Sequence, residues 1–289
     1  MPEMPEVQAH AERMTDALGG RALAKFELLN FASLKTFDPP IDAAVGHRLV
    51  EVDRRGKYLL LRFDNGQTHV VHLMQGGRLR PDAKRSRKPK LGMARWVFAG
   101  AGDDEGDAGA EEAWLLTEAG SERKAGVWAT ADDPLALEPL TVLGPEATDL
   151  DRDQLGELLG GHSKRLHGLL RDQRVIAGLG RMLANEICYE ARLSPFANAS
   201  KLNDEQLDRL HAAIATVVEA ATNHERTLDD IGKSADRPSK VHNRAGEPCV
   251  DCDDTIRTVE YRAYTVYYCP EFQTDGKLLA DNTTSKFLK

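Results

Sequence analysis

The chain has 289 residues, of which 41% are hydrophobic and 29% are charged, and its formal net charge is −8. This length allows two domains with cores of their own, and no apolar run is long enough to span a membrane. No cationic segment followed by an apolar one begins the sequence, so we expect a cytoplasmic protein without a secretory signal.

The first predicted element is a helix whose apolar face runs from Val7 to Leu18 and which a pair of glycines ends. Pro5 suits the first turn of such a helix. The helix does not explain Pro2 and Glu3, which precede it. These two residues therefore need either a structural or a chemical reason from elsewhere.

The next part of the chain is predicted to be mostly β-structure. Four short apolar runs, KYLLLRF, THVVHLM, ARWVFA and AWLLTEA, are divided by turn signals. We place a β domain at residues 2–130 and a Pro-rich linker at 131–148. The acidic stretch 100–112 is predicted to be an exposed hairpin loop.

Charge is segregated along the chain, so the net value says little about partners. The stretch RLRPDAKRSRKPK, which begins at Arg78, is strongly basic. It is either a solvated loop or a phosphate-binding loop.

The pattern becomes helical over residues 149–235. Asp151 with Gln154, and Asn203 with Gln206, have the spacing of capping boxes. Residues 240–289 return to short strands around three cysteines. The predicted fold is therefore α+β and multidomain.

The helical part contains RVIAGLGRMLANEI, in which Gly178 and Gly180 precede Arg181 at the start of an apolar-periodic segment. A glycine turn before a helix directs N–H groups outward, which suits a phosphate. The same pair of glycines is also what an ordinary turn requires.

Four cysteines are present, and Cys188 lies in an apolar helical pattern typical of a core residue. Cys249 and Cys252 have CxxC spacing, and Cys269 begins a second such pair that position 272 would complete. Phe272 stands there instead. Three thiols are a partial zinc set, since a structural zinc site normally has four protein ligands.

Several short segments occur together and in order: PE at the start, RRGKYLL, VVHLMQGGRL, GLGRMLANEI, GEPCVDC and YYCPEFQ. This series resembles the formamidopyrimidine-DNA glycosylase/endonuclease VIII family over nearly the whole chain. The resemblance implies an N-terminal helix with a β-sandwich, a helix-two-turn-helix domain at 149–235, and a zinc-ribbon-like β-hairpin finger, here degenerate, at 240–289. It also implies base-excision repair: removal of oxidised bases from DNA and cleavage of the abasic strand.

The resemblance explains the first residues. Removal of Met1 would expose the amine of Pro2, and a terminal amine has a pKa of about 8, against about 10.4 for lysine. This amine could attack the damaged nucleotide and form an iminium, which permits β-elimination. By resemblance, Glu3 would shuttle protons and Glu6 would support the pocket. Lys57, which by itself would be interpreted as a surface lysine, would act near the sugar and phosphate.

The resemblance also assigns residues to DNA binding. These are the backbone-contacting His72, the wedge residue Gln75, and Arg123, Arg181 and Arg262. The expected partner is damaged DNA, either double-stranded or locally unpaired. We expect a monomer that is associated with the nucleoid when bound to DNA and has no membrane partner. The resemblance also implies Zn²⁺ at Cys249, Cys252 and Cys269, although the chemistry itself does not need a metal.

The sequence departs from the family at several binding positions. Gln75 stands in place of a void-filling methionine, and Ala125 in place of a wedge phenylalanine. Arg181 replaces a phosphate-binding asparagine, and Tyr264 aligns with the phosphate-binding arginine of the ribbon. A weak wedge predicts a preference for lesions in already weakened DNA, because flipping a base costs a few kcal/mol.

Two other functions compete with this one. The altered wedge and ribbon favour a DNA-binding protein that recognises damage or abasic sites with weak or lost turnover. An N-terminal-proline tautomerase acting on small molecules is a third possibility, which the basic loop and the cysteine ribbon oppose.

Overall fold

The computed structural model describes residues 2–100, 110–119, 123–232, 236–261 and 263–279. The chain divides into two compact units, one of residues 1–142 with 225–232, the other of 143–224 with 233–289. Most of the acidic stretch 100–112, predicted to be a hairpin loop, lies outside the described residues. None of the described helices is both long and apolar enough to cross a membrane.

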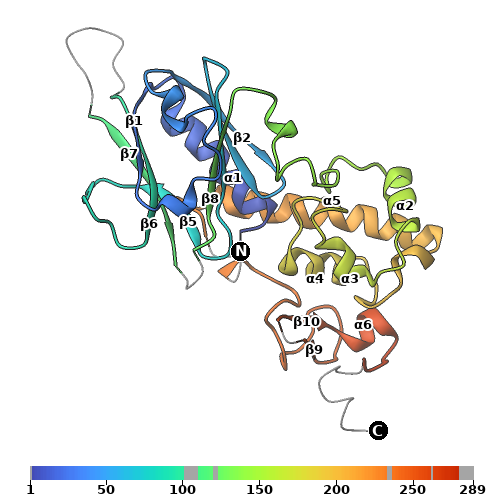
Figure 1. Cartoon of the computed structure of the whole chain (residues 1–289). Helices are drawn as coiled ribbons and strands as arrows, with labels where there is room; N and C mark the ends of the chain where they lie inside the picture. The colour runs from blue at the N-terminus through green and yellow to red at the C-terminus, as the bar shows by residue number, and fades with distance from the viewer. Residues whose placement is uncertain (1, 101–109, 120–122, 233–235, 262, 280–289) are drawn as a thin grey trace. The chain divides into compact units, whose positions relative to one another are not determined.

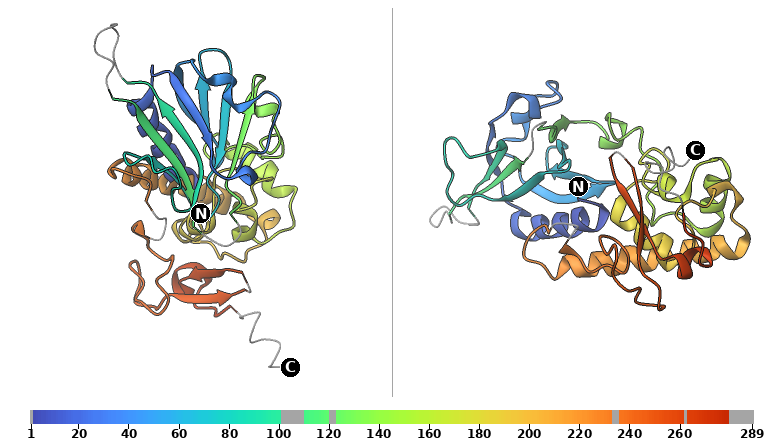
Figure 2. Two further views of the ribbon diagram at one scale, coloured as in Figure 1. Left: turned by 60° about the vertical axis from the view of Figure 1, so that its left-hand side comes forward. Right: turned by 90° about the horizontal axis from the view of Figure 1, so that it is seen from below.

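The first unit is a helix with two antiparallel sheets, drawn in blue to green in Figures 1 and 2. The helix α1 spans Met4–Leu18. One sheet has the order β1-β6-β7-β5, with strands Leu23–Leu28, Gly92–Phe98, Glu112–Glu118 and Gly77–Pro81. The other has the order β2-β3-β4-β8, with strands Leu49–Arg55, Tyr58–Phe63, Thr68–His72 and Gly126–Thr130. Short 3₁₀ turns occur at Phe31–Ser33, Ile41–Ala44 and Pro134–Ala136.

The core of this unit lies between the two sheets and beneath α1. The predicted apolar face of the helix, from Val7 to Leu18, is buried in it. The indole of Trp96 on β6 donates to Nδ1 of His69 on β4 over 3.0 Å, a buried bond that joins the sheets. The segment Glu225–Gly232 returns to this unit, where Ile231 joins the core. The predicted sandwich with an N-terminal helix is confirmed.

The second unit is helical and ends in a small hairpin. Its helices are α2 (Arg152–Gly160), α3 (Leu166–Leu170), α4 (Arg181–Glu190), most of α5 (Asp204–Arg226) and α6 (Pro270–Thr274), with a 3₁₀ turn at Ala199–Lys201. Strands β9 (Arg257–Glu260) and β10 (Thr265–Tyr268) pair antiparallel. Both predicted capping boxes are present, at Asp151 with Gln154 and at Asn203 with Gln206. The predicted core position of Cys188 is also confirmed.

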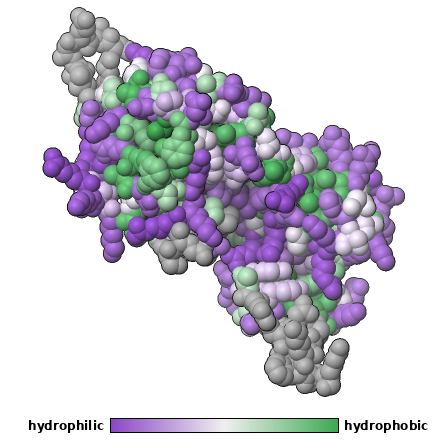
Figure 3. All heavy atoms as spheres, in the orientation of Figure 1, coloured by the Kyte–Doolittle hydropathy of each residue, from purple (hydrophilic) through white to green (hydrophobic). Residues whose placement is uncertain are grey.

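Figure 3 shows a mostly hydrophilic face with one larger hydrophobic area over the first unit. The exposed apolar residues of this unit include Phe31 and Phe37, whose rings stack with centroids 5.7 Å apart. They flank Lys35, whose backbone N–H donates to the carbonyl of Val127 on β8. The aromatic pair therefore belongs to the β8 edge of its sheet.

Arg95 forms the most buried ion-pair cluster described in the first unit. Its side chain is 4% exposed and bonds both Glu27, at 2.5 Å, and Asp82, at 2.8 Å. Arg62 makes a similar pair of contacts with Glu51 and Asp53, but it is 33% exposed. The two arginines thus have similar partners and different solvation.

We expect Arg95→Met to lower the free energy of unfolding by about 3 kcal/mol, because it leaves the partly buried Asp82 without its cation and Glu27 with Lys25 alone. Arg62→Met should cost less than about 1 kcal/mol, since water replaces an exposed partner. All three tryptophans lie in the first unit, so their fluorescence during urea unfolding measures its stability. Equal losses of unfolding free energy in the two variants would show that the buried Arg95 ion pairs stabilise the unit no more than the exposed Arg62 pairs do.

Candidate active site and nucleic-acid interface

The first residues of the chain are buried at the start of α1. Pro2 is buried, and Glu3 and Glu6 are 4% and 0% exposed. The carboxylate of Glu6 accepts the N–H of Glu3 over 2.9 Å, and the two residues form a capping box. Glu3 therefore has a structural role that the sequence did not reveal. Burial of two carboxylates beside Pro2 is more than a helix start requires, since exposed caps serve equally well.

Lys57 occupies an unusual position for a lysine. It lies in the two-residue turn between β2 and β3, where the preceding Gly56 has φ of +57°. A hairpin tip normally exposes its side chains, yet Lys57 is only 7% exposed. Keeping an ammonium group in a buried position is costly, so this lysine is a candidate for function.

A chain of contacts connects this hairpin to α1. The guanidinium of Arg54 donates to the side-chain oxygen of Gln8 over 3.0 Å and to the carbonyl of Gly56 over 2.9 Å. Thr15 on α1 also exchanges hydrogen bonds with the backbone of Val52 on β2. The hairpin that carries Lys57 is therefore fixed to the helix that begins at Glu3.

His72 ends β4 and pairs across the sheet with Tyr58, the residue after Lys57. The His72 and Tyr58 rings lie 4.3 Å apart. Burial, with a smaller effect of the Lys57 ammonium, lowers the pKa of His72 to about 4. The imidazole is therefore neutral at pH 7 and adjoins the lysine.

Gln75 is exposed on the tight loop between β4 and β5. A Cβ on Gly76 would stand 1.9 Å from the carbonyl oxygen of Ala119, and one on Gly77 1.9 Å from that of Leu73. Both positions thus require glycine. Met74 adopts φ of +55°, and its Sδ lies 2.7 Å from Nδ1 of His72. The loop is held on both sides, and Gln75 extends from its tip.

The loop after β7 lies next to the Gln75 loop, since the N–H of Ala119 donates to the carbonyl of Gly76. Arg123 is exposed on it, with φ of +44°. Ala125, expected at a wedge position, is instead fully buried in the core, and its N–H donates to the carboxylate of Glu118 over 2.6 Å. Ala125 is therefore not positioned to enter DNA.

The first unit thus gathers Lys57, His72, Gln75 and Arg123 at one end of its sheets. The pairs Tyr58–His72 and His72–Gly126 on neighbouring strands produce this arrangement. The basic stretch from Arg78 is partly neutralised within the unit: Arg80 bonds Asp230, and Arg85 bonds Glu111. Lys84, Arg87, Lys88 and Lys90 stay exposed.

The second unit carries the other predicted DNA-binding residues. Gly178, at φ of +95°, belongs to a turn that the side chain of Gln173 holds through Gly178 N–H and the Leu179 carbonyl. Arg181 begins α4, is exposed, and donates to the carbonyl of Ala263 over 3.2 Å. Arg262 lies outside the described residues.

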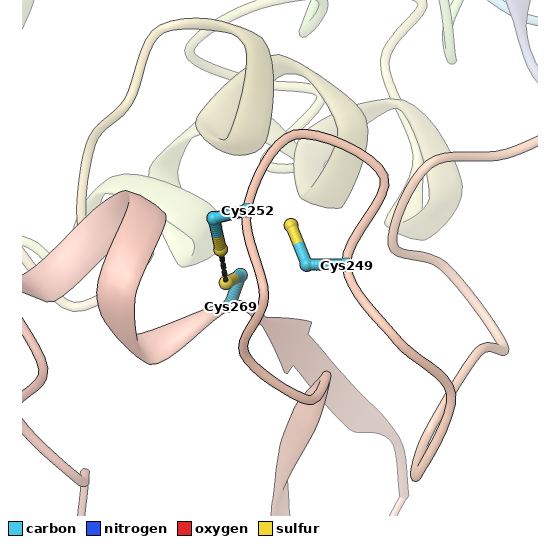
Figure 4. A group of neighbouring side chains, drawn as sticks. All are labelled: Cys249, Cys252 and Cys269. Carbon is cyan, nitrogen blue, oxygen red and sulfur yellow. Dashed lines mark hydrogen bonds between the residues drawn. The ribbon is translucent and has the colours of Figure 1, made fainter.

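The three cysteines Cys249, Cys252 and Cys269 form one cluster, with their sulfur atoms within 4.8 Å of one another. Figure 4 shows the thiol of Cys252 directed at that of Cys269, 3.3 Å away, with Cys249 opposite. No histidine or carboxylate of the described residues joins the cluster. The ring of Phe272 packs near that of Tyr189, with 4.8 Å between the ring centroids. The hydroxyl of Tyr189 lies 2.9 Å from the sulfur of Cys249.

These thiols fit zinc as three of the usual four ligands. His242, which also lies in this part of the chain, is bonded to the side chain of Asn185 over 2.7 Å. Neither Asp253 nor Glu271 is part of the cluster. The site therefore suits a metal that completes its coordination without a further side chain from the described part of the chain.

Comparison with known proteins identifies related families and folds. A family model of the formamidopyrimidine-DNA glycosylase N-terminal domain matches residues 1–107, and one of the formamidopyrimidine-DNA glycosylase H2TH domain matches residues 136–230. A formamidopyrimidine-DNA glycosylase of Chloroflexus aurantiacus is 32% identical over 284 residues, covering 94% of this chain and 98% of the relative. An uncharacterised formamidopyrimidine-DNA glycosylase-like protein of Mycobacterium tuberculosis is 41% identical over 149 residues, covering 51% of this chain and 94% of the relative.

Solved structures agree with these relatives. The MutM (Fpg) protein of Thermus thermophilus superposes with a TM-score of 0.78 at 26% identity, covering 94% of this chain and 98% of that one. The Lactococcus lactis Fpg in complex with abasic-site DNA gives a TM-score of 0.81 at 20% identity, with 94% and 99% coverage. This second likeness shows the fold alone.

The burial of Ala125 leads to a stability prediction. Ala125→Phe should lower the free energy of unfolding by about 2 kcal/mol, because the added ring overpacks a filled core. Gln75→Phe should change it by less than about 0.5 kcal/mol, since this side chain is exposed. Urea unfolding followed by tryptophan fluorescence measures both variants. An Ala125→Phe protein as stable as the parent would mean that the position is open and can carry a wedge.

Proposed function

The chain belongs to the formamidopyrimidine-DNA glycosylase family, and from this we propose that it is a base-excision repair enzyme. It would remove oxidised bases from DNA as a glycosylase and cleave the abasic strand as a lyase. Support comes from the buried group at the start of α1, where two carboxylates accompany Pro2. Its substrate is then chromosomal DNA. The protein would be located in the cytoplasm and would be associated with the nucleoid when bound to DNA.

The reaction begins with the Pro2 amine once Met1 is removed. Its nitrogen forms a bond to C1′ of the damaged nucleotide while the bond from C1′ to the base breaks. The nitrogen loses its proton, and the bond from C1′ to the sugar ring oxygen then breaks as Glu3 protonates that oxygen. Because Pro2 is a secondary amine, the product is a cationic iminium, which acidifies the C2′ protons. Loss of one such proton breaks the bond from C3′ to the phosphate oxygen, and water then releases Pro2.

The neighbouring groups have distinct tasks. Glu3, buried beside the amine, moves protons at the sugar ring oxygen and the departing base, and Glu6 holds the Glu3 backbone. Lys57, a cation of the same unit, contacts the sugar and the phosphate of the damaged nucleotide. The neutral imidazole of His72 donates a hydrogen bond to the DNA backbone without adding charge beside Lys57.

Binding draws on cationic groups of each unit. Arg123 and the exposed lysines after β5 serve in the first unit, and Arg181 in the second. Gln75 is the exposed side chain left to fill the gap when a base is flipped out, since Ala125 is buried. A single polar wedge favours lesions in locally unpaired DNA, where less stacking energy is lost.

A second candidate function is a protein that binds damage or abasic sites with weak or lost turnover. The burial of Ala125, which removes one wedge, favours it. The buried Pro2 and Glu3 oppose it together with Lys57, because a binding protein needs neither a buried terminal amine nor a carboxylate beside it.

We further propose that Cys249, Cys252 and Cys269 hold Zn²⁺ weakly and that packing of Phe272 stabilises the finger alongside it. Bound zinc would cross-link the loop of the first two cysteines to the start of α6. The chemistry of base removal needs no metal.

The nucleophile can be tested by trapping. Borohydride should reduce the iminium and link the protein to an abasic-site oligonucleotide. A variant that keeps an extra residue before Pro2 should not trap, because its amine is blocked; mass spectrometry of the N-terminus verifies both proteins. Equal trapping by the blocked variant would exclude Pro2. Glu3→Gln should reduce base removal more than cleavage at a preformed abasic site, which has no base to expel.

The metal site can be tested at Phe272. The parent should retain well under one zinc per chain after dialysis against a mild chelator, and Phe272→Cys should retain about one, since four thiolates complete the site. Phe272→Ser is the control, because it removes the ring without adding a thiolate. One firmly held zinc in the parent protein would refute the weak-site assignment.

A further inference from the structure

A row of aromatic rings connects the tip of the β9–β10 hairpin with the helical part of the second unit. Neighbouring ring centroids lie 6.3, 4.6 and 6.0 Å apart, and each pair is tilted by 21° or less, along the series Phe196, Tyr261, Tyr264 and His167. His167 belongs to α3. Two tyrosines of the hairpin are thus stacked between residues of the helical domain.

Arg171, which caps the C-terminal end of α3, lies over this row. Its guanidinium carbon is 3.6 Å from the centroid of the Tyr264 ring. A guanidinium stacked by its face keeps its N–H groups directed outward at its edges. No described residue accepts a hydrogen bond from them, and the adjacent carboxylate, Asp172, bonds Lys164 instead. Arg171 is therefore held in place with its donors available.

A second cation adjoins the first. Arg181 donates to the carbonyl of Ala263, the residue before Tyr264. Burial lowers the pKa of Arg171, and the charge of Arg181 lowers it further. The two tyrosines, Tyr264 and Tyr261, partly offset this effect. No carboxylate of the described residues offsets this pair. Two neighbouring guanidinium groups without a bound carboxylate form a binding site for an anion.

We infer that Arg171 and Arg181 together bind one phosphate group of the DNA backbone, with the Tyr264 ring orienting Arg171. The inference rests on the proposed function and adds to it a residue that the sequence comparison did not indicate. Guanidinium edges match phosphate oxygens in paired hydrogen bonds. A polyanion with phosphates at regular spacing suits a surface site beside an exposed arginine better than a small buried ligand does.

This site explains the tyrosine at the hairpin. The resemblance places a phosphate-binding arginine at position 264, where this chain has no cation. Arg171 supplies the charge from the end of α3, and its position over the Tyr264 ring brings that charge to the same hairpin residue.

The test measures how DNA binding depends on salt. Full-length protein is titrated by fluorescence anisotropy into a duplex with one tetrahydrofuran abasic analogue, which the lyase cannot cleave, at several KCl concentrations. Arg171→Met should weaken binding about tenfold at 0.1 M salt and reduce the slope of log K against log salt by about one, as expected for one lost phosphate contact. Arg171→Met with Tyr264→Arg should recover most of that slope.

Arg192→Met is the matched control, since Arg192 also lies over an aromatic ring, that of Phe272, at 4.7 Å. It should leave the slope unchanged. Tyr264→Leu separates binding from hairpin stability: it removes the stack but keeps both arginines, so the slope should persist while affinity falls. An unchanged slope in Arg171→Met, or an equal loss of slope in Tyr264→Leu, would show that Arg171 only stabilises the hairpin.

The outcome is distinguishable from that of the proposed function. If the parent protein binds the duplex with the expected slope change in Arg171→Met but fails to trap with borohydride, the phosphate site holds and the enzymatic proposal fails. If the parent traps and the slope does not respond, the phosphate site is wrong. A parent that does not bind the duplex overturns both.

Discussion

The antiparallel pairing of β3, β4 and β8 is the constraint on which the candidate site depends. It fixes Tyr58 opposite His72 and His72 opposite Gly126, so the turn with Lys57 and the loop with Arg123 meet at one end of the sheet. Because side chains alternate along a strand, a shift by one residue would reverse every core position. In the observed register, Leu59, Leu61, Val71 and Val127 lie in the core between the two sheets. The core therefore determines where the cations lie.

A second constraint acts at the start of α1, where structure and proposed chemistry use the same atoms. Glu6 holds the backbone of Glu3, and the capping box satisfies N–H groups that the first helical turn leaves open. The same contacts fix the backbone of Glu3, the residue next to Pro2. A nucleophile on a fraying terminus would lose this positioning. The helix start is thus a means of ordering the end of the chain.

The sequence predicted much of the fold because the relevant signals are local. The apolar face from Val7 to Leu18 and both capping boxes depend on residues within a few positions of one another. The burial of Lys57 and the contact of Arg171 with Tyr264 could not be predicted this way, because each arises between segments far apart in the chain. The burial of Ala125 could not be predicted for a related reason: the resemblance gives only its correspondence to a wedge phenylalanine, while its solvation depends on packing in the core.

The departures from the family pattern concern binding positions, and the physical demands on the two kinds of site explain this. Attack by an amine requires a nitrogen, a proton shuttle and a cation at fixed separations, and such groups have few substitutes. A phosphate contact requires only a donor with positive charge within reach, and several residues on neighbouring elements can provide it. In the proposed phosphate site, Arg171 at the end of α3 supplies such a charge beside Tyr264 of the hairpin. A binding surface can therefore be rebuilt from other residues while the catalytic group stays unchanged.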